Sequence, residues 1–209
     1  RDQMGKDAFQ SVDMVSIVSP VCKLAICPQN PKTAVDEVIH AIKVAKEGKP
    51  GPVVIDLPLD MQKCEVEFDP ESYVPAKVEN PKASPCAIKA AMEMLQEAKN
   101  PVILMGGGVI EAKAEKELVR FAEIMQIPVV TTYMARGGIP AEHPLNAGTP
   151  GIQVGQPIGN KTFLDSDCVL AIGNRFTDRH TGVIGIYKGD RKFIHINVEP
   201  HEIGKIFAP

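Results

Sequence analysis

The chain has 209 residues, and 44% of them are hydrophobic, which is typical of a folded globular protein and not of a disordered one. Lysine and arginine number 23 and aspartate and glutamate 26, so the formal net charge of -3 gives no reason to expect nucleic acid or an anionic membrane as a partner. No apolar run reaches the roughly 18 residues of a membrane span. Five cysteines without a C-x-x-C pair indicate reduced thiols in a cytoplasmic protein and no zinc site: Cys22, Cys27, Cys64, Cys86 and Cys168.

The first third of the chain contains one predicted helix and one predicted strand. The chain opens at Arg1 with polar residues that suggest no element, and we expect it to be a piece of a longer polypeptide. At residues 33–47 apolar side chains recur at helical spacing, and Gly48 followed by Pro50 predicts the end of that helix. Residues 52–57 are a short apolar run typical of a buried parallel strand. The apolar face of the helix consists of Val35, Val38, Ile39, Ile42 and Ala45.

A stretch without periodicity follows. Between Met61 and Ala83, charged residues alternate with Pro70, Pro75 and Pro81, a pattern typical of an extended linker. The residues before this linker are therefore predicted to form a partial α/β arm.

Helices and strands then alternate to the end of the chain. Ser84 and Pro85 predict the N-cap and first residue of a helix, and an irregular stretch rich in glycine and proline occupies residues 135–151. This alternation predicts an α/β fold with a doubly wound parallel sheet. The predicted helices are 84–98, 112–126 and one from Pro200, and the predicted strands are 101–105, 127–131, 168–173 and 193–198.

Three glycines follow the predicted strand at residues 101–105. Ligands of open α/β sheets bind at the carboxyl ends of the strands, and glycine lets backbone N–H groups approach a phosphate. The standard dinucleotide fingerprint would have glycine or alanine where Glu111 stands. Gly106, Gly107 and Gly108 are therefore interpreted either as a phosphate contact or as a plain tight turn.

Charged side chains follow the predicted strand at residues 168–173. Arg175 and Arg179 flank Asp178, directly after a strand that stops at Gly173. One interpretation is a surface ion pair of little energetic weight. The other is two guanidinium groups for phosphate oxygens, with a carboxylate that orients one of them. The position at a strand end favours the second interpretation.

The histidines carry no catalytic assignment. His195 alternates with isoleucines inside a predicted strand, so we expect it to pack in the sheet. Asn197 ends that strand and is interpreted either as a contact for ribose hydroxyls or as a turn-forming residue. The sequence contains no nucleophile elbow, no Walker loop and no Gly-Asp-Gly magnesium–diphosphate motif, so it presents no complete active site.

Together these motifs resemble the thiamine-diphosphate enzymes of the acetolactate synthase group, and more closely their glyoxylate carboligase (tartronate-semialdehyde synthase) branch. The resemblance covers essentially the whole chain. The segments typical of the group are 7–10, 48–58, 106–108 and 173–176. The segments typical of the carboligase branch are 67–70 with Tyr73, 173–176 with 179–182, 194–196, 199–200 and 203–204.

The resemblance implies three α/β domains. The first binds the pyrimidine of thiamine diphosphate and carries an activating glutamate, the third binds the diphosphate through Mg2+, and the central one binds FAD, which does no net redox chemistry in these enzymes. By resemblance, residues 1–61 are the C-terminal part of the pyrimidine-binding domain, 62–83 a linker and 84–209 the central, Rossmann-like FAD-binding domain. The activating glutamate and the magnesium site then lie outside this chain, which alone is predicted to be inactive.

The resemblance also implies cofactor contacts. Phe9 and Gln10 match a segment near the carbon–carbon bond-forming site of a neighbouring subunit. The family often has arginine in place of Lys49 and methionine in place of Thr149, and lysine loses the bidentate fork of arginine. The FAD contacts carried over are Lys49, Gly106, Gly107, Gly108, Thr132, Tyr133, Met134, Gly148, Thr149, Gly173, Asn174, Arg175, Asp178, Arg179, His180, Asn197, Val198 and Glu202.

The implied activity is the joining of two glyoxylates to tartronate semialdehyde with release of CO2. Acetolactate synthase, which condenses two pyruvates, is the alternative, although Leu59 replaces a lysine common there. A second alternative is a structural central domain without flavin. The implied partners are the missing domains of the same polypeptide and further copies in a homo-oligomer, a dimer or tetramer.

Overall fold

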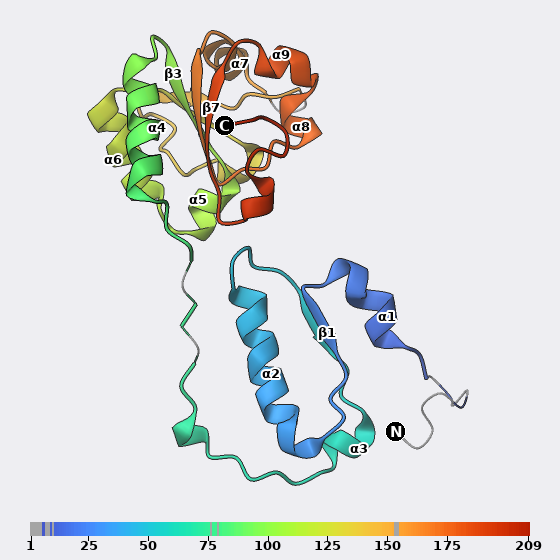
Figure 1. The fold of residues 1–209 in the computed structure, drawn as a ribbon. Coiled ribbons are helices and arrows are strands. Elements are labelled where there is room, and N and C mark those ends of the chain that lie inside the picture. Colours follow the sequence, from blue (N-terminus) through green and yellow to red (C-terminus); the bar gives the residue numbers. More distant parts are fainter. Residues whose placement is uncertain (1–5, 7–8, 10, 76, 79, 153–154) are drawn as a thin grey trace. The chain divides into compact units, whose positions relative to one another are not determined.

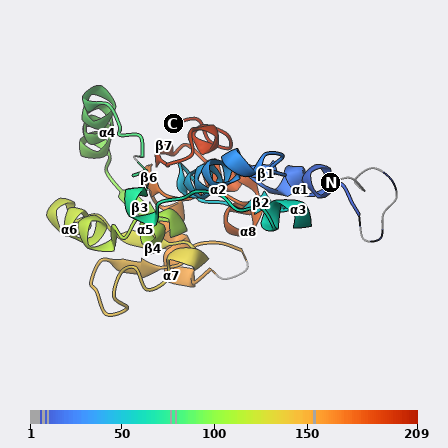
Figure 2. The same cartoon turned by 90° about the horizontal axis from the view of Figure 1, so that it is seen from below.

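The computed structural model of the chain describes residues 6, 9, 11–75, 77–78, 80–152 and 155–209, and Figures 1 and 2 trace its course. Its internal contacts divide the chain into two compact units, Arg1–Pro81 and Lys82–Pro209. The boundary between the units falls within residues 62–83, the predicted linker.

The N-terminal unit contains two short parallel strands. Strand β1 (Leu24–Ile26) pairs with β2 (Val53–Ile55), and Leu24 lies opposite Val53. Strand β2 lies inside the predicted run 52–57, whereas β1 was not predicted. The helices are α1 (Met14–Val18), α2 (Pro31–Lys46) and α3 (Leu59–Gln62), and a 3-10 turn spans Ser19–Val21.

Helix α2 corresponds to the helix predicted at residues 33–47, and its ends follow local chemistry. The side chain of Asn30 accepts a hydrogen bond from the N–H of Lys32 at 3.1 Å, which caps the first turn. Gly48 has a φ of 59°, as expected for a residue just past the C-cap. Four of the five residues of the predicted apolar face are partly buried, whereas Ile42 is 42% exposed and the buried residue of the helix is Ala41.

Residues 63–84 contain one described regular element, the 3-10 turn η2 at Pro70–Ser72. Asp69 caps this turn by accepting a hydrogen bond from the N–H of Glu71 at 3.0 Å. The remaining described residues of this stretch form no helix or strand, which agrees with the loss of periodicity in the sequence.

The C-terminal unit is built on a parallel sheet with the strand order β5-β4-β3-β6-β7. Chain order and spatial order differ, because β3 lies in the middle and later strands are added on both of its sides. This arrangement confirms the doubly wound fold. The strands are β3 (Pro101–Met105), β4 (Val129–Thr131), β5 (Asn146–Gly148), β6 (Cys168–Ile172) and β7 (Lys192–Ile196).

Helices cover both faces of this sheet (Figure 1). Alternate residues of β3 point to opposite sides, so that Ile103 packs with α4 and α6 whereas Leu104 packs with α7 and α9. The second face is rich in aromatic rings, among them Phe163 and Phe193. The helices are α4 (Pro85–Glu97), α5 (Gly107–Glu111), α6 (Glu115–Met125), α7 (Pro157–Leu164), α8 (Asp178–Thr181) and α9 (Ile184–Lys188).

Several predicted elements need correction. The predicted helix 112–126 corresponds to α6, which begins three residues later, after Lys113 with a φ of 54°, and the short helix α5 before it was not predicted. The predicted last helix is a single 3-10 turn, η4 (Pro200–Glu202). The irregular stretch 135–151 contains the edge strand β5, and helices α7, α8 and α9 were not predicted. All of these missed elements have eight residues or fewer, too short for hydrophobic periodicity to reveal them.

None of the five cysteines, which all lie in the described ranges, forms a disulfide. Among the described residues no cluster of three or more histidine, cysteine, aspartate or glutamate side chains could bind a metal ion. No helix in the described ranges has the length and apolar character needed to cross a membrane.

Candidate functional site

The carboxyl ends of β3 and β6 meet at the point where the strand order reverses. Strands β3 and β6 are in register along five residues, from Pro101 opposite Cys168 to Met105 opposite Ile172. The loops that follow them therefore emerge side by side. This is the position at which doubly wound sheets bind their ligands.

The two loops are in direct backbone contact. The N–H of Gly106 donates to the carbonyl of Ile172, and that of Gly108 to the carbonyl of Gly173, each at 2.8 Å. A Cβ atom on Gly106 would lie 2.3 Å from the oxygen of Gly173, which itself has a φ of 65°. Glycine is thus required here for the approach of two protein segments. One of the two sequence interpretations had these amide groups face a phosphate and the other made them a tight turn; the N–H groups of Gly106 and Gly108 are bonded within the protein.

Asn174 connects the end of β6 with the end of β7. Its carbonyl accepts hydrogen bonds from Nε2 of His195 at 3.0 Å and from Nδ2 of Asn197 at 2.7 Å, while its Oδ1 accepts from the N–H of Phe176. Asn174 is 7% exposed. Its Nδ2 is a buried donor that has no partner among the described residues. Buried donors are rarely left unpaired, so this amide is suited to donate to a bound ligand.

Phe176 anchors the loop after β6. It has a φ of 52° and is buried, with its ring 4.9 Å from that of Phe207 and 5.7 Å from that of Phe193. A left-handed conformation at a bulky residue is uncommon and is maintained here by aromatic packing. The neighbouring Arg175 is exposed. Of these two adjacent residues, Phe176 is therefore buried in the protein and Arg175 is exposed to solvent.

Arg175, Asp178 and Arg179 are all exposed near the start of α8. No ion pair or side-chain hydrogen bond joins these three residues to one another or to any other described residue. Neither the surface ion pair nor the orienting role of Asp178 is present. The two guanidinium groups thus remain without a carboxylate partner in the described ranges.

His180 faces the protein interior. The hydroxyl of Tyr187 lies 3.3 Å from its Nε2, and the two rings are 5.3 Å apart. Burial lowers the pKa of His180 from 6.5 to about 4, so the imidazole is neutral at pH 7. Burial also raises the pKa of the Tyr187 phenol. Any ligand contact of His180 would therefore be that of a neutral ring and not of a cation.

Thr149 and Arg136 form a second polar group at the ends of β4 and β5. The Thr149 hydroxyl lies 3.3 Å from the hydroxyl of Thr131 and accepts a hydrogen bond from Nε of Arg136 at 3.2 Å. Thr149 is 2% exposed, so its side chain is buried in the protein. Arg136 was missed in the sequence because it lies in a stretch without periodicity. Gly148, with a φ of 87°, directs the chain so that the Thr149 N–H reaches the side chain of Gln156.

The remaining predicted residues are dispersed along the same edge or lie elsewhere. The backbone N–H of Thr132 extends the β3–β4 pairing, and Tyr133 and Met134 are exposed. The Oδ1 of Asn197 accepts from the N–H of Glu199, as expected for a turn-forming asparagine. Val198 is partly buried, and Glu202 pairs with Lys205 at 3.5 Å. Lys49 and the exposed Phe9 belong to the N-terminal unit, and Gln10 lies outside the described residues.

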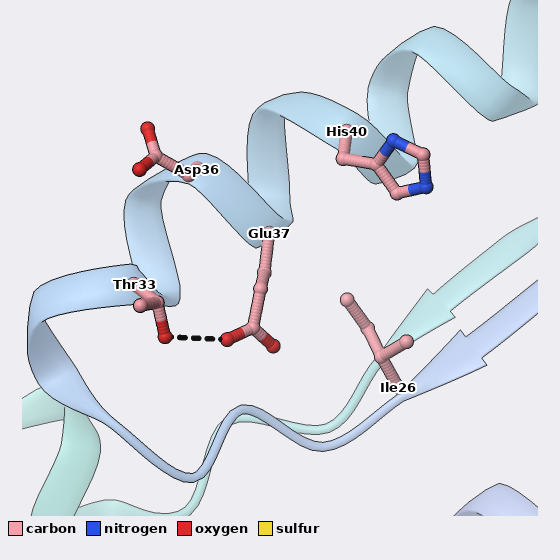
Figure 3. Close-up of a pocket in the computed structure, with 5 residues that line it drawn as sticks. All are labelled: Ile26, Thr33, Asp36, Glu37 and His40. Atoms are coloured by element: carbon pink, nitrogen blue, oxygen red, sulfur yellow. Dashed lines mark hydrogen bonds between the residues drawn. The ribbon is translucent and has the colours of Figure 1, made fainter.

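A pocket of about 330 Å³ lies in the N-terminal unit, and its lining residues include none of the predicted site residues (Figure 3). It is lined by Ile26 of β1 and by Thr33, Asp36, Glu37 and His40 of α2. The Thr33 hydroxyl donates to the Glu37 carboxylate at 2.7 Å.

The sheet order and the glycine contact between β3 and β6 define a doubly wound α/β domain of the Rossmann type. Residues 88–209 match the family model described as thiamine pyrophosphate enzyme, central domain. The chain therefore belongs to the thiamine pyrophosphate enzymes and contains their central domain.

The whole chain is similar to curated members of this family. It is 44% identical over 209 residues to glyoxylate carboligase of Escherichia coli O157:H7. It is 41% identical to the probable acetolactate synthase large subunit of Methanocaldococcus jannaschii and 41% identical to the acetolactate synthase large subunit of Corynebacterium glutamicum. These matches cover 100%, 97% and 97% of this chain but only 35%, 35% and 33% of the relatives. The chain thus spans about a third of their length.

Proposed function

We propose that the chain is part of a thiamine-diphosphate-dependent carboligase that joins two glyoxylates to tartronate semialdehyde and releases CO2. The observation that carries this proposal is the 44% identity to glyoxylate carboligase along the whole chain. Acetolactate synthase is the second candidate, because relatives of that name reach 41% identity. Leu59 favours the carboligase, since the matching position is lysine in many acetolactate synthases.

Within this enzyme, the C-terminal unit is proposed to bind FAD. The residues present fit such a group, because Asn174 has a buried Nδ2 donor that no described residue pairs, and the exposed Arg175 and Arg179 follow it in the loop after β6 and on α8. Arg175 and Arg179 would bind the diphosphate through charge-assisted hydrogen bonds, and the Asn174 amide would donate to a nucleotide oxygen. By resemblance, the flavin supplies no net redox chemistry in carboligation. The competing interpretation, a structural domain without flavin, leaves the buried Asn174 donor unexplained.

The N-terminal unit is proposed to be the C-terminal part of the pyrimidine-binding domain. Its described sheet has two strands, and large apolar side chains such as Ile17, Val21 and Leu59 are more than half exposed. Exposed apolar surface of this kind is typical of a face that packs against further protein. The activating glutamate and the Mg2+ ligands would belong to other domains of the same polypeptide. We also propose that the complete enzyme is a cytoplasmic homo-oligomer.

The test uses the full-length enzyme supplied with thiamine diphosphate and Mg2+. Assays with glyoxylate and with pyruvate, read as CO2 release and product identity, are expected to show turnover of glyoxylate to tartronate semialdehyde. Preferential formation of acetolactate from pyruvate would instead establish the second candidate. The 209-residue chain assayed under the same conditions is expected to release no CO2 from glyoxylate. Measurable release would contradict the proposal that the activating glutamate and the Mg2+ ligands belong to other domains.

A further inference from the structure

The contacts of the Arg136 side chain include Thr149 and Tyr133. Its Nε donates to the Thr149 hydroxyl at 3.2 Å, and its central carbon lies 5.5 Å from the ring centroid of Tyr133. The residue is nevertheless exposed. An exposed arginine normally loses side-chain conformational entropy when it binds a ligand. This entropic cost is smaller when the side chain is already held in one orientation.

Thr149 is suited to orient Arg136 because it is itself immobilised. Its side chain is 2% exposed, and its hydroxyl lies 3.3 Å from that of Thr131 at the end of β4. Its backbone N–H donates to Oε1 of Gln156 at 3.1 Å. A buried hydroxyl needs hydrogen-bond partners, and this one has Thr131 on one side and Arg136 on the other. The ligand-facing role implied by resemblance does not suit such a side chain.

Arg136 also lies on the correct edge of the sheet. It follows the 3-10 turn η3 (Tyr133–Ala135), which packs against the glycine run: a Cβ on Gly107 would lie 3.0 Å from Cβ of Met134. Arg175 and Arg179 emerge on the other side of β3, after β6. The segment that follows β5 contacts α8, because a Cβ on Gly151 would lie 3.3 Å from the carbonyl oxygen of His180.

We infer that Arg136 is a third guanidinium contact for the diphosphate of the bound dinucleotide and that Thr149 is the residue that positions it. The inference rests on the proposed flavin site. A hydrogen bond to a charged group contributes about 1.5–3 kcal/mol, which corresponds to roughly tenfold to a hundredfold in affinity. Removing the Thr149 hydroxyl should cost a large part of the same affinity, because the guanidinium then loses the hydrogen bond from its Nε.

The experiment is an equilibrium titration of flavin-depleted full-length enzyme with FAD at several salt concentrations, and with ADP as a competing ligand. Arg136→Gln removes the charge, Thr149→Val removes the hydroxyl at nearly constant shape, and Thr149→Ser restores it. Arg120→Gln, on the exposed surface of α6, makes the same charge change away from the carboxyl edge. Circular dichroism of each variant checks that the fold is retained.

The expected result is a loss of FAD affinity of roughly tenfold or more in Arg136→Gln, with an equal loss for ADP and a shallower salt dependence. Thr149→Val should show most of this loss, Thr149→Ser little, and the double variant Arg136→Gln/Thr149→Val no more than Arg136→Gln alone. Unchanged FAD affinity in Arg136→Gln, or additive losses in the double variant, would overturn the inference and leave the flavin proposal intact. Absence of saturable FAD binding to the unmodified enzyme would overturn both.

Discussion

Arg191 packs on the ring of Phe163 and hydrogen-bonds to the C-terminal ends of α7 and α9. Its guanidinium carbon lies 5.3 Å from the Phe163 ring centroid, and its Nε donates to the Phe163 carbonyl at 3.0 Å. The same side chain donates to the carbonyls of Leu164, Ile186 and Tyr187. These carbonyls belong to the last turns of α7 and α9, where helices lack internal partners, and that of Phe163 also accepts hydrogen bonds from Ser166. One cation thus caps both helices on the aromatic face of the sheet.

Replacing this cation should destabilise the C-terminal unit. Arg191→Met keeps the aliphatic stem but removes every donor, so we expect the free energy of unfolding to fall by roughly 2–4 kcal/mol, measured by urea denaturation. Arg191→Lys should recover only part of the loss, because an ammonium lacks the planar fork. Arg120→Met on the exposed surface of α6 is the matched control, with an expected change within about 0.5 kcal/mol. An Arg191→Met variant as stable as this control would contradict the assigned capping role.

Gly173 should tolerate no side chain. A Cβ at this position would lie 2.7 Å from Cα of Gly108, and the φ of 65° disfavours any residue other than glycine. We expect Gly173→Ala to lower the free energy of unfolding by about 2–5 kcal/mol, through combined strain and overpacking. The control is Gly185→Ala in α9, where a Cβ meets nothing within 4 Å. That change should leave stability unchanged or raise it by roughly 0.5–1 kcal/mol. Equal stability of the two variants would show that the loops separate readily.

His180 should make stability depend on pH. Burial lowers its pKa in the folded chain to about 4 from 6.5, so between these values the unfolded chain binds the extra proton. Stability should therefore fall as the pH drops from 6.5 to 4, by up to about 3 kcal/mol, and change little from this group above pH 6.5. In His180→Phe this part of the pH dependence should disappear, as urea denaturation across the range would measure. His201→Gln, at an exposed histidine, should leave the profile unchanged. Identical slopes for the unmodified protein and His180→Phe would show that the imidazole is not desolvated.

Arg175 should be required for flavin retention in the full-length enzyme. Loss of a charge-assisted phosphate contact weakens binding by roughly tenfold to a hundredfold, so Arg175→Ala should be purified with little FAD. His201 lies exposed on η4, and His201→Ala should retain flavin. Flavin absorbance per mole of protein compares the two variants directly. Stoichiometric flavin of unchanged affinity in Arg175→Ala would mean that the loop after β6 has only a structural role.

The long elements of the fold were predictable from local sequence. Helix α4 begins where Ser84 and Pro85 predict it, and the Ser84 hydroxyl accepts from the N–H of Ala87 at 3.2 Å. The strands β3, β6 and β7 lie within one residue of their predicted starts, because each is an apolar run with clear ends. The family was evident from the motifs, and its central domain accounts for residues 88–209.

The hydrogen bonds and burial of individual residues at the carboxyl edge of the sheet could not be predicted, because they depend on tertiary contacts. No local pattern indicates that the amides of Gly106 and Gly108 bond to the neighbouring loop, or that the Thr149 hydroxyl contacts Arg136. Likewise, the sequence places His180 next to Arg179, while its burial in the fold lowers the pKa of the imidazole to about 4. Composition and periodicity determine which segments become strands and helices, because those preferences are local. Which donors and charges remain available to a ligand depends on the strands and loops that pack around them, because burial and hydrogen bonding arise between segments distant in the chain.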